Sequence, residues 1–444
     1  MATNDTITKI QIVAPNKLSA AITSATSLTS ATVTSTSINA TISLDALYRV
    51  ALENANRAKE YRKRYVYSEL RNLLSQFQAL KNKKPCILIP GIRGIGKTTI
   101  MLQLFSDLKD AFYFTADSLL VKSSTLYSLV EQAHRTGYKT VFIDEIHRYP
   151  NWAAELKNIY DSFNVQIVAS GSSTAAIKKG SLFLGRRAYE IPLFPLSFGE
   201  YVYLQEGQRY EANIIDILNK RASIQWIADH PSVEKHYNNY LLTGGFPFRL
   251  EERGSLFSLM KKMIYEDALT EFNLSEAKVD VAERILSFLA ASKLGEFSYT
   301  SFSSTSGYSK STVYEGARLL IELELLRVVS GATPKAKANE TVKILFSHPN
   351  LRAAFADQLM VSPDIGALRE EYFVFHLSLL GIPVFLPKKM KKNPDYEAVV
   401  FGKHMIFEIG TASKTKKQLQ GLEGAVLDPI GLMVLGFVQK TNQK

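Results

Sequence analysis

Glycines, a lysine and a threonine at fixed spacing form the clearest candidate site in this sequence. Gly91, Gly96, Lys97 and Thr98 fit the pattern G-x-x-x-x-G-K-[ST], which is typical of a loop that wraps the phosphates of a nucleotide. Glycine lets the backbone curl until several N–H groups point at one phosphate, and the helix that follows directs its positive end at the same anion. The predicted nucleotide-binding residues are Gly91, Ile92, Arg93, Gly94, Ile95, Gly96, Lys97, Thr98 and Thr99.

Two adjacent residues at the end of this loop have predicted chemical roles. We expect Lys97 to reach the β- and γ-phosphates and Thr98 to hold Mg²⁺. The apolar run Cys86–Ile89 before the loop and the helical spacing after it provide the strand and helix that the motif requires.

Two adjacent carboxylates follow a second apolar run, Val141–Ile143. Asp144 is expected at the carboxyl end of that strand, where it would support the Mg²⁺, and Glu145 beside it would act as general base toward the attacking water. An acidic pair after a strand is also typical of a helix cap, but the upstream glycine-rich loop favours catalysis.

The spacing of apolar runs predicts the elements that hold these residues. Helical stretches separate the predicted strands, and this alternation favours a mostly parallel sheet with helices on both faces. Ser170 ends the fourth strand, where it would touch the γ-phosphate or the lytic water; an ordinary serine-rich turn is an equal alternative. The predicted strands are Cys86–Ile89, Ala111–Thr115, Thr140–Ile143, Val165–Ser170 and Ala188–Ile191.

A string of motifs in order resembles a bacterial and archaeal family of AAA-type ATPases with a C-terminal domain of unknown function. The matching pieces are GIRGIGKTT, FIDEIHRYPNW, IVASGSS, SLFLGRRAYEIPLFPLSFGEYV and YLLTGGFP. The resemblance implies ATP and Mg as ligands, a polar sensor at Ser170, and an arginine at Arg186. That arginine would neutralise γ-phosphate charge in cis or from a neighbouring subunit. A solvated surface position for Arg186 is an equal alternative.

The residue patterns and the same resemblance together predict the domain plan, in which the lid and the nuclease-like domain are what the resemblance implies. The expected fold is α/β: a P-loop NTPase sheet, a helical lid, a winged helix and a C-terminal domain similar to PD-(D/E)xK nucleases. The expected parts are a Ser/Thr-rich segment over 1–43, the ATPase core over 44–195, the lid over 196–280, the winged helix over 281–330 and the nuclease-like domain over 331–444.

The nuclease-like domain departs from its family pattern at one position. Asp395 and Glu408 would be the metal-binding carboxylates, with Glu371 as a third, but Gly410 stands where an active enzyme has lysine. Lys414 or Lys416 from the next loop is a candidate replacement. A retained fold without nuclease chemistry is the favoured interpretation.

Composition narrows the class of protein. The net charge is +11, which favours an acidic partner, nucleic acid first. A charge that serves only solubility is the alternative, because the basic residues are scattered along the sequence. The single cysteine, Cys86, excludes an internal disulfide framework, and no apolar run reaches the length of a membrane span. We therefore expect a cytoplasmic protein, with oligomerisation left open.

Two main function classes stay open from the sequence. The favoured one is an ATP-hydrolysing protein that couples its nucleotide state to a partner, possible partners being DNA or another protein. The alternatives are an ATP-gated nuclease or DNA-processing effector and a nucleotide-binding scaffold without turnover. A GTPase is disfavoured because no N-K-x-D guanine-reading motif follows the core strands.

Overall fold

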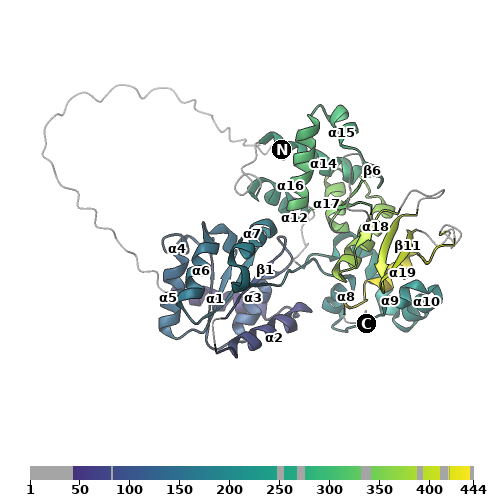
Figure 1. Ribbon diagram of the computed structural model, residues 1–444. Coiled ribbons are helices and arrows are strands. Elements are labelled where there is room, and N and C mark those ends of the chain that lie inside the picture. Colours follow the sequence, from purple (N-terminus) through teal and green to yellow (C-terminus); the bar gives the residue numbers. More distant parts are fainter. Residues whose placement is uncertain are drawn as a thin grey trace, which may run out of the picture. The chain divides into compact units, whose positions relative to one another are not determined.

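Five parallel strands form the sheet that carries the glycine-rich loop (Figure 1). Their spatial order is β2-β3-β4-β1-β5. Each strand end lies within one residue of its prediction, so the parallel α/β sheet is confirmed. The strands are β1 (Cys86–Pro90), β2 (Ala111–Thr115), β3 (Thr140–Asp144), β4 (Gln166–Gly171) and β5 (Ala188–Glu190).

The computed structural model describes residues 44–81, 84–247, 255–267, 276–331, 342–387, 394–410, 419 and 421–440. The predicted Ser/Thr-rich segment 1–43 lies outside the described residues, as do Lys414 and Lys416. No helix among the described residues is both long and apolar enough to cross a bilayer.

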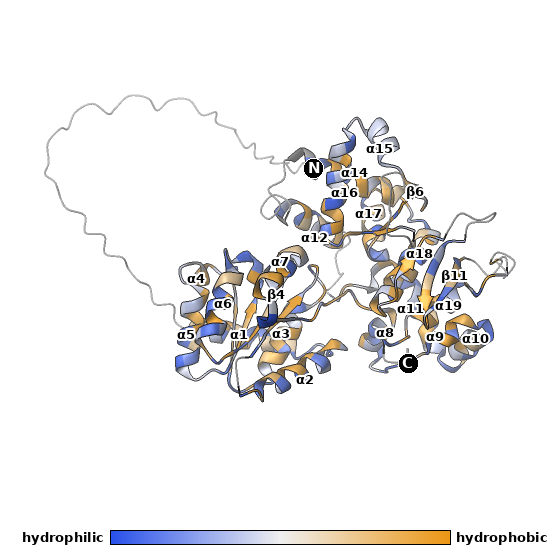
Figure 2. Cartoon of the chain, viewed as in Figure 1, coloured by the Kyte–Doolittle hydropathy of each residue, from blue (hydrophilic) through white to orange (hydrophobic). Residues whose placement is uncertain are grey.

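Helices cover both faces of the parallel sheet because its strands are apolar on both sides. Along β1, Ile87 and Ile89 join one hydrophobic cluster while Cys86 and Leu88 join another. Figure 2 colours α3 mainly orange, for hydrophobic residues. The first cluster includes side chains of α1 (Leu44–Ala58), α2 (Val66–Gln78) and α3 (Lys97–Ser106). The second includes those of α5 (Leu126–Thr136), α6 (Trp152–Ser162) and α7 (Thr174–Leu184).

The strand order positions the candidate residues. Strand β4 lies between β1 and β3, with Ile89 of β1 opposite Ser170 and Ile143 of β3 opposite Ala169. Parallel strands end at the same edge of a sheet. Ser170 therefore lies between the glycine-rich loop and Asp144. The short elements of this region are α4 (Leu119–Lys122), η1 (Ile146–Arg148) and η2 (Gly185–Arg187).

Helices after residue 196 share a core with the C-terminal part of the chain. Phe198 and Tyr240 lie in one hydrophobic cluster with Tyr372 and Phe437. Helices α9 and α10 contact α19, and Figure 1 shows them next to it. The helices before the gap at residue 248 are α8 (Phe198–Glu206), α9 (Ile214–Leu218), α10 (Lys220–Asp229), η3 (Pro231–Val233), α11 (Glu234–Asn239) and the π-helix η4 (Tyr240–Gly244).

A second group of helices surrounds a small antiparallel sheet of order β6-β8-β7. Strand β8 lies beyond the predicted boundary at residue 330, yet it pairs with both β6 and β7. The elements are α12 (Ser255–Lys262), the π-helix η5 (Met263–Asp267), α14 (Glu276–Ala291), β6 (Glu296–Phe297), α15 (Tyr299–Ser306), α16 (Lys310–Glu322), β7 (Leu326–Val329) and β8 (Val342–Phe346).

The last sheet has the order β12-β11-β10-β9, and its only parallel pair among the described strands is β11 with β12. The described residues form one compact unit. The remaining elements are α17 (Pro349–Gln358), α18 (Ile365–Leu379), β9 (Val384–Phe385), β10 (Tyr396–Val400), β11 (Lys403–Ile409), β12 (Gly424–Leu427) and α19 (Pro429–Leu435).

Candidate functional site

The glycine-rich loop has the conformation that its sequence predicts. A Cβ atom on Gly91 would lie 2.4 Å from the carbonyl oxygen of Leu193, so no larger residue fits there without a backbone shift. Gly96 has a φ of 89°, in the left-handed region where residues other than glycine are strained. The loop therefore depends on glycine at both ends of the motif.

Lys97 begins α3, so the first N–H groups of that helix point toward the loop. Its ammonium group donates to the carbonyl oxygens of Gly91 at 2.7 Å and Ile92 at 3.0 Å. The side chain is 5% exposed, so a cation is held against the loop at the positive end of a helix. This arrangement suits a polyanion such as a triphosphate.

Thr98 and Asp144 meet where the loop faces β3. The Thr98 hydroxyl donates to Oδ2 of Asp144 at 2.6 Å, and the Tyr113 hydroxyl donates to the same oxygen at 2.9 Å. Ser170 donates to the other carboxylate oxygen. A hydroxyl beside a buried carboxylate fits Mg²⁺, which takes oxygen ligands and needs few protein groups when phosphates supply the rest. Among the described residues no larger group of metal-binding side chains occurs.

Glu145 is held in an uncommon backbone conformation next to this pair. Its φ is 51°, in the left-handed region, which is strained for a residue with a side chain. Its carboxylate accepts from the Ser172 hydroxyl at 3.0 Å. Burial raises the pKa of Glu145 above its ordinary value, although Lys97 opposes the shift. A carboxylate with a raised pKa is a stronger proton acceptor, as a general base requires.

His147 packs against the same carboxylate, with its Nδ1 3.3 Å from Oε2 of Glu145. Burial, helped by Lys97 and Arg93, lowers the pKa of His147 to about 3. The imidazole is therefore neutral at physiological pH and leaves the charge of Glu145 in place.

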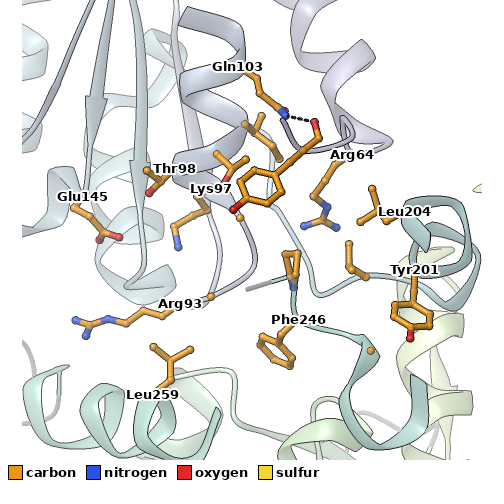
Figure 3. Close-up of a pocket in the computed structure, with 18 of the residues that line it drawn as sticks. Arg64, Arg93, Lys97, Thr98, Gln103, Glu145, Tyr201, Leu204, Phe246 and Leu259 are labelled. Carbon is orange, nitrogen blue, oxygen red and sulfur yellow. Dashed lines mark hydrogen bonds between the residues drawn. The ribbon is translucent and has the colours of Figure 1, made fainter. Parts of the chain in front are cut away.

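A cavity of about 1760 Å³ joins these groups. Lys97, Thr98 and Glu145 line one side, and Phe246 and Leu259 line another (Figure 3). Ligand pockets commonly measure ~300–1,000 Å³, so a nucleotide fits with room to spare. Charged, polar and apolar side chains in one cavity suit a triphosphate joined to an aromatic base.

A buried ion pair holds the loop at the wall of the cavity. Arg64 donates to both carboxylate oxygens of Glu200, through Nε at 3.0 Å and through Nη2 at 2.6 Å. It also donates to the carbonyl oxygens of Ile95 at 2.7 Å and Phe194 at 3.0 Å. Arg64 thus ties the glycine-rich loop to the segment that leads into α8.

Two arginines reach the phosphate end of the cavity, and both contact one carboxylate. Nη2 of Arg93 lies 3.0 Å from Oε2 of Glu266, and Nη2 of Arg148 lies 2.6 Å from the same oxygen. Glu266 belongs to η5, far along the chain from either arginine. All three residues line the cavity.

The structure does not bring every predicted site residue to the cavity. Ser170 is fully buried and its hydroxyl is directed at Asp144, so it lies behind the carboxylate and not at the cavity wall. Arg186 lies on η2, exposed and outside the residues that line the cavity. A role for Arg186 toward a neighbouring subunit stays a prediction.

The predicted carboxylates of the C-terminal domain lie close in register. Tyr396 pairs with Phe407 in an antiparallel ladder, so the preceding Asp395 lies across from Glu408. Oδ2 of Asp395 accepts from the backbone N–H of Ile409 at 2.7 Å. Glu371, the suggested third ligand, is instead buried against Arg352 with an Oε1–Nη2 distance of 2.8 Å. Glu371 therefore has a structural partner and no metal-binding geometry.

Comparison with known proteins identifies the domain around the loop. Residues 83–202 match the AAA domain family. This match covers the whole parallel sheet, so that part of the chain is similar to AAA domains, and the similarity supports ATP binding at the cavity. The predicted nuclease-like domain at the C-terminal end has no such support.

The relatives found in the comparisons do not indicate an activity for this chain. An uncharacterized protein of Methanocaldococcus jannaschii is 26% identical over 396 residues, which cover 82% of this chain and 83% of that protein. The Walker-type ATPase of Pyrococcus abyssi is 12% identical, with a TM-score of 0.38 over 65% of this chain and 94% of that chain. The branch migration motor RuvB of Thermotoga maritima is 12% identical, with a TM-score of 0.29 over 68% of this chain and 96% of that chain. Scores this low carry no conclusion about this chain.

Proposed function

We propose that this protein hydrolyses ATP with Mg²⁺. The observation that supports it best is the contact between Thr98 and Asp144 beside Glu145. Thr98 and Glu145 line the same cavity, and Asp144 accepts the hydrogen bond of the Thr98 hydroxyl. The family match over residues 83–202 supports ATP as the nucleotide.

The chain's own residues divide the reaction between binding and proton transfer. Lys97 and the N–H groups at the start of α3 hold the phosphates, and Thr98 and Asp144 hold the Mg²⁺. Bound Mg²⁺ neutralises charge on the phosphate oxygens. Glu145 orients a water molecule and accepts its proton, while Ser172 and His147 fix the carboxylate.

The structure also offers a route from the nucleotide to the rest of the chain. Phe246 and Leu259, which line the cavity, belong to the segments on either side of the gap at 248–254. Leu259 lies on α12, which contacts α17. We propose that the nucleotide state is transmitted through these segments to a partner.

DNA is the favoured partner. The net charge of +11 supports it, and α15, α16 and the β6-β8-β7 sheet follow the element order of a winged helix. Addition of duplex DNA to the ATPase assay tests this, and stimulation of turnover is the expected result. Unchanged turnover, with no binding to labelled DNA, would favour a protein partner.

Oligomerisation is a further part of the proposal. Leu182 and Phe183 are 84% and 58% exposed at the end of α7, directly before Arg186. An apolar contact there would carry Arg186 toward a neighbouring cavity. Light scattering with and without ATP tests this, and a mass of one chain under both conditions would contradict it.

The experiment for the main proposal is ATP turnover measured with and without Mg²⁺. We expect Mg²⁺-dependent turnover in the wild type and its loss in Lys97→Ala, because the phosphates lose their buried cation. Glu131→Gln is the control, since Glu131 pairs with Arg135 on the surface of α5 and lies outside the cavity lining. Tight ATP binding without turnover would favour the scaffold alternative.

Nuclease activity is the second candidate, favoured by Asp395 lying across from Glu408 on neighbouring strands. Two carboxylates on adjacent strands are the metal-binding part of such sites, whereas Gly410 leaves the position of the lysine without a side chain that can act. Cleavage of duplex DNA with Mg²⁺, lost in Asp395→Asn, would establish it. Absence of cleavage would support the alternative, a retained fold without nuclease chemistry.

A further inference from the structure

Three cationic side chains surround one carboxylate at the phosphate end of the cavity. Oε2 of Glu266 lies 3.0 Å from Nη2 of Arg93 and 2.6 Å from Nη2 of Arg148. Oε1 of Glu266 lies 3.6 Å from Nζ of Lys262. One negative charge therefore faces three positive ones, and the cluster keeps a net positive charge that attracts an anion.

The position of these groups relates them to the reaction. Arg93 is in the middle of the glycine-rich loop, and Figure 3 shows it on the same side of the cavity as Glu145. Its Nε lies 3.3 Å from the Ser172 hydroxyl, which donates to Glu145 at 3.0 Å. Arg148 ends η1, the short helix that follows Glu145 directly. Both guanidinium groups are thus anchored on elements that carry the general base or the phosphate loop.

We propose that Arg148 binds the terminal phosphate of ATP within the same chain, and that Glu266 competes with that phosphate for Arg148 and Arg93. This rests on the proposed ATPase function. A guanidinium group binds phosphate as readily as carboxylate, because its parallel N–H groups match both. Arg148 then neutralises the phosphate charge within one chain, where Arg186 does not line the cavity. The role of Arg186 toward a neighbouring subunit stays a separate prediction.

The competition has a consequence for η5. When a phosphate takes the two arginines, Glu266 loses the contacts to Arg93 and Arg148 and keeps the contact to Lys262. Glu266 belongs to η5, which contacts α14. The terminal phosphate thereby changes which residues hold η5, whereas ADP, which lacks that phosphate, leaves the contacts to Glu266 in place.

The test is the ratio of ATP to ADP affinity, measured by calorimetry on the full chain with Mg²⁺. For Arg148→Ala we expect ATP affinity to fall at least ~10-fold while ADP affinity stays within ~2-fold, because charge-assisted hydrogen bonds to phosphate are strong. For Glu266→Gln, which keeps the shape of the side chain, we expect ATP affinity to rise several-fold with ADP unchanged. Arg135→Ala and Glu131→Gln are matched controls from an exposed pair on α5.

The outcomes separate this inference from the ATPase proposal. If Lys97→Ala abolishes ATP binding but Arg148→Ala lowers ATP and ADP affinity equally, or changes neither, the site stands and the role of Arg148 is refuted. If the wild type binds no ATP, the proposed function itself fails. If Arg148→Ala does not fold, Glu266→Gln still tests the competition. An unchanged ratio of ATP to ADP affinity in Glu266→Gln would contradict the proposed competition between Glu266 and the phosphate.

Discussion

Arg64 provides the sharpest test of how the glycine-rich loop is held. Arg64 and Glu200 are 8% and 7% exposed, and two hydrogen bonds join them. Replacement of Arg64 by methionine keeps the apolar stem but leaves the Glu200 carboxylate buried without its cation. We expect the free energy of unfolding to fall by ~3–5 kcal/mol, the usual cost of breaking one side of a buried pair.

A double-mutant cycle isolates the pair. Arg64→Met and Glu200→Met should each destabilise strongly, while the double variant should cost at least ~2 kcal/mol less than their sum, because it leaves no unpaired buried charge. Urea denaturation followed by tryptophan fluorescence measures the three values. The control cycle uses Arg57 and Glu53, which are 71% and 68% exposed, and should give at most ~0.5 kcal/mol.

Additive costs in the buried cycle would refute this reasoning. Arg64 would then stabilise the loop through the carbonyl oxygens of Ile95 and Phe194 alone, and not through Glu200. The ATP affinity of Arg64→Met is a second test. It should fall as well, because Arg64 holds the carbonyl group of Ile95 inside the glycine-rich loop.

Two further predictions concern packing and pH. Gly91→Ala should abolish ATP binding and lower the melting temperature in scanning fluorimetry, since its Cβ would lie 2.4 Å from a backbone oxygen; full binding would contradict the loop geometry. Burial lowers the pKa of His376 from 6.5 to about 3, so the unfolded chain gains a proton there that the folded chain rejects. The free energy of unfolding should therefore fall as pH falls below ~6.5, by up to ~1.4 kcal/mol per pH unit from this residue. Urea midpoints measured against pH for the wild type and His376→Gln check this, and the midpoint should change less steeply with pH in the variant.

The buried position of His376 explains the sign of that pH effect. Its Nε2 accepts a hydrogen bond from the backbone N–H of Phe198 at 3.0 Å, and its Nδ1 lies 2.8 Å from the carbonyl oxygen of Tyr372, to which it donates. A second proton would bring two N–H groups face to face. Equal slopes in wild type and variant would show that other groups control the loss of stability.

The sequence was most informative where structure is local. A strand, a glycine-rich turn and a helix start are adjacent in the chain, so apolar runs and glycine spacing predicted all five strands of the sheet. Asp144 is the last residue of its strand, and the sheet order then brings it to Thr98.

Contacts between residues far apart in the chain could not be predicted from apolar runs and motif spacing. Glu266 lies 118 residues after Arg148 and 173 residues after Arg93, and no motif marks it. Phe198 and Tyr240, both in the predicted lid over 196–280, pack with residues more than a hundred positions later, and no motif in the sequence indicates this packing. Apolar periodicity shows that a helix has a buried face, but not which distant element covers it.

A single-turnover experiment with Glu145→Gln tests whether Glu145 is the general base. We predict that this variant binds ATP with Mg²⁺ about as tightly as the wild type but leaves it uncleaved, since Lys97, Thr98 and Asp144 remain while the proton acceptor is gone. Cleavage at the wild-type rate would contradict the assignment of Glu145 as general base and, with it, the proposed mechanism.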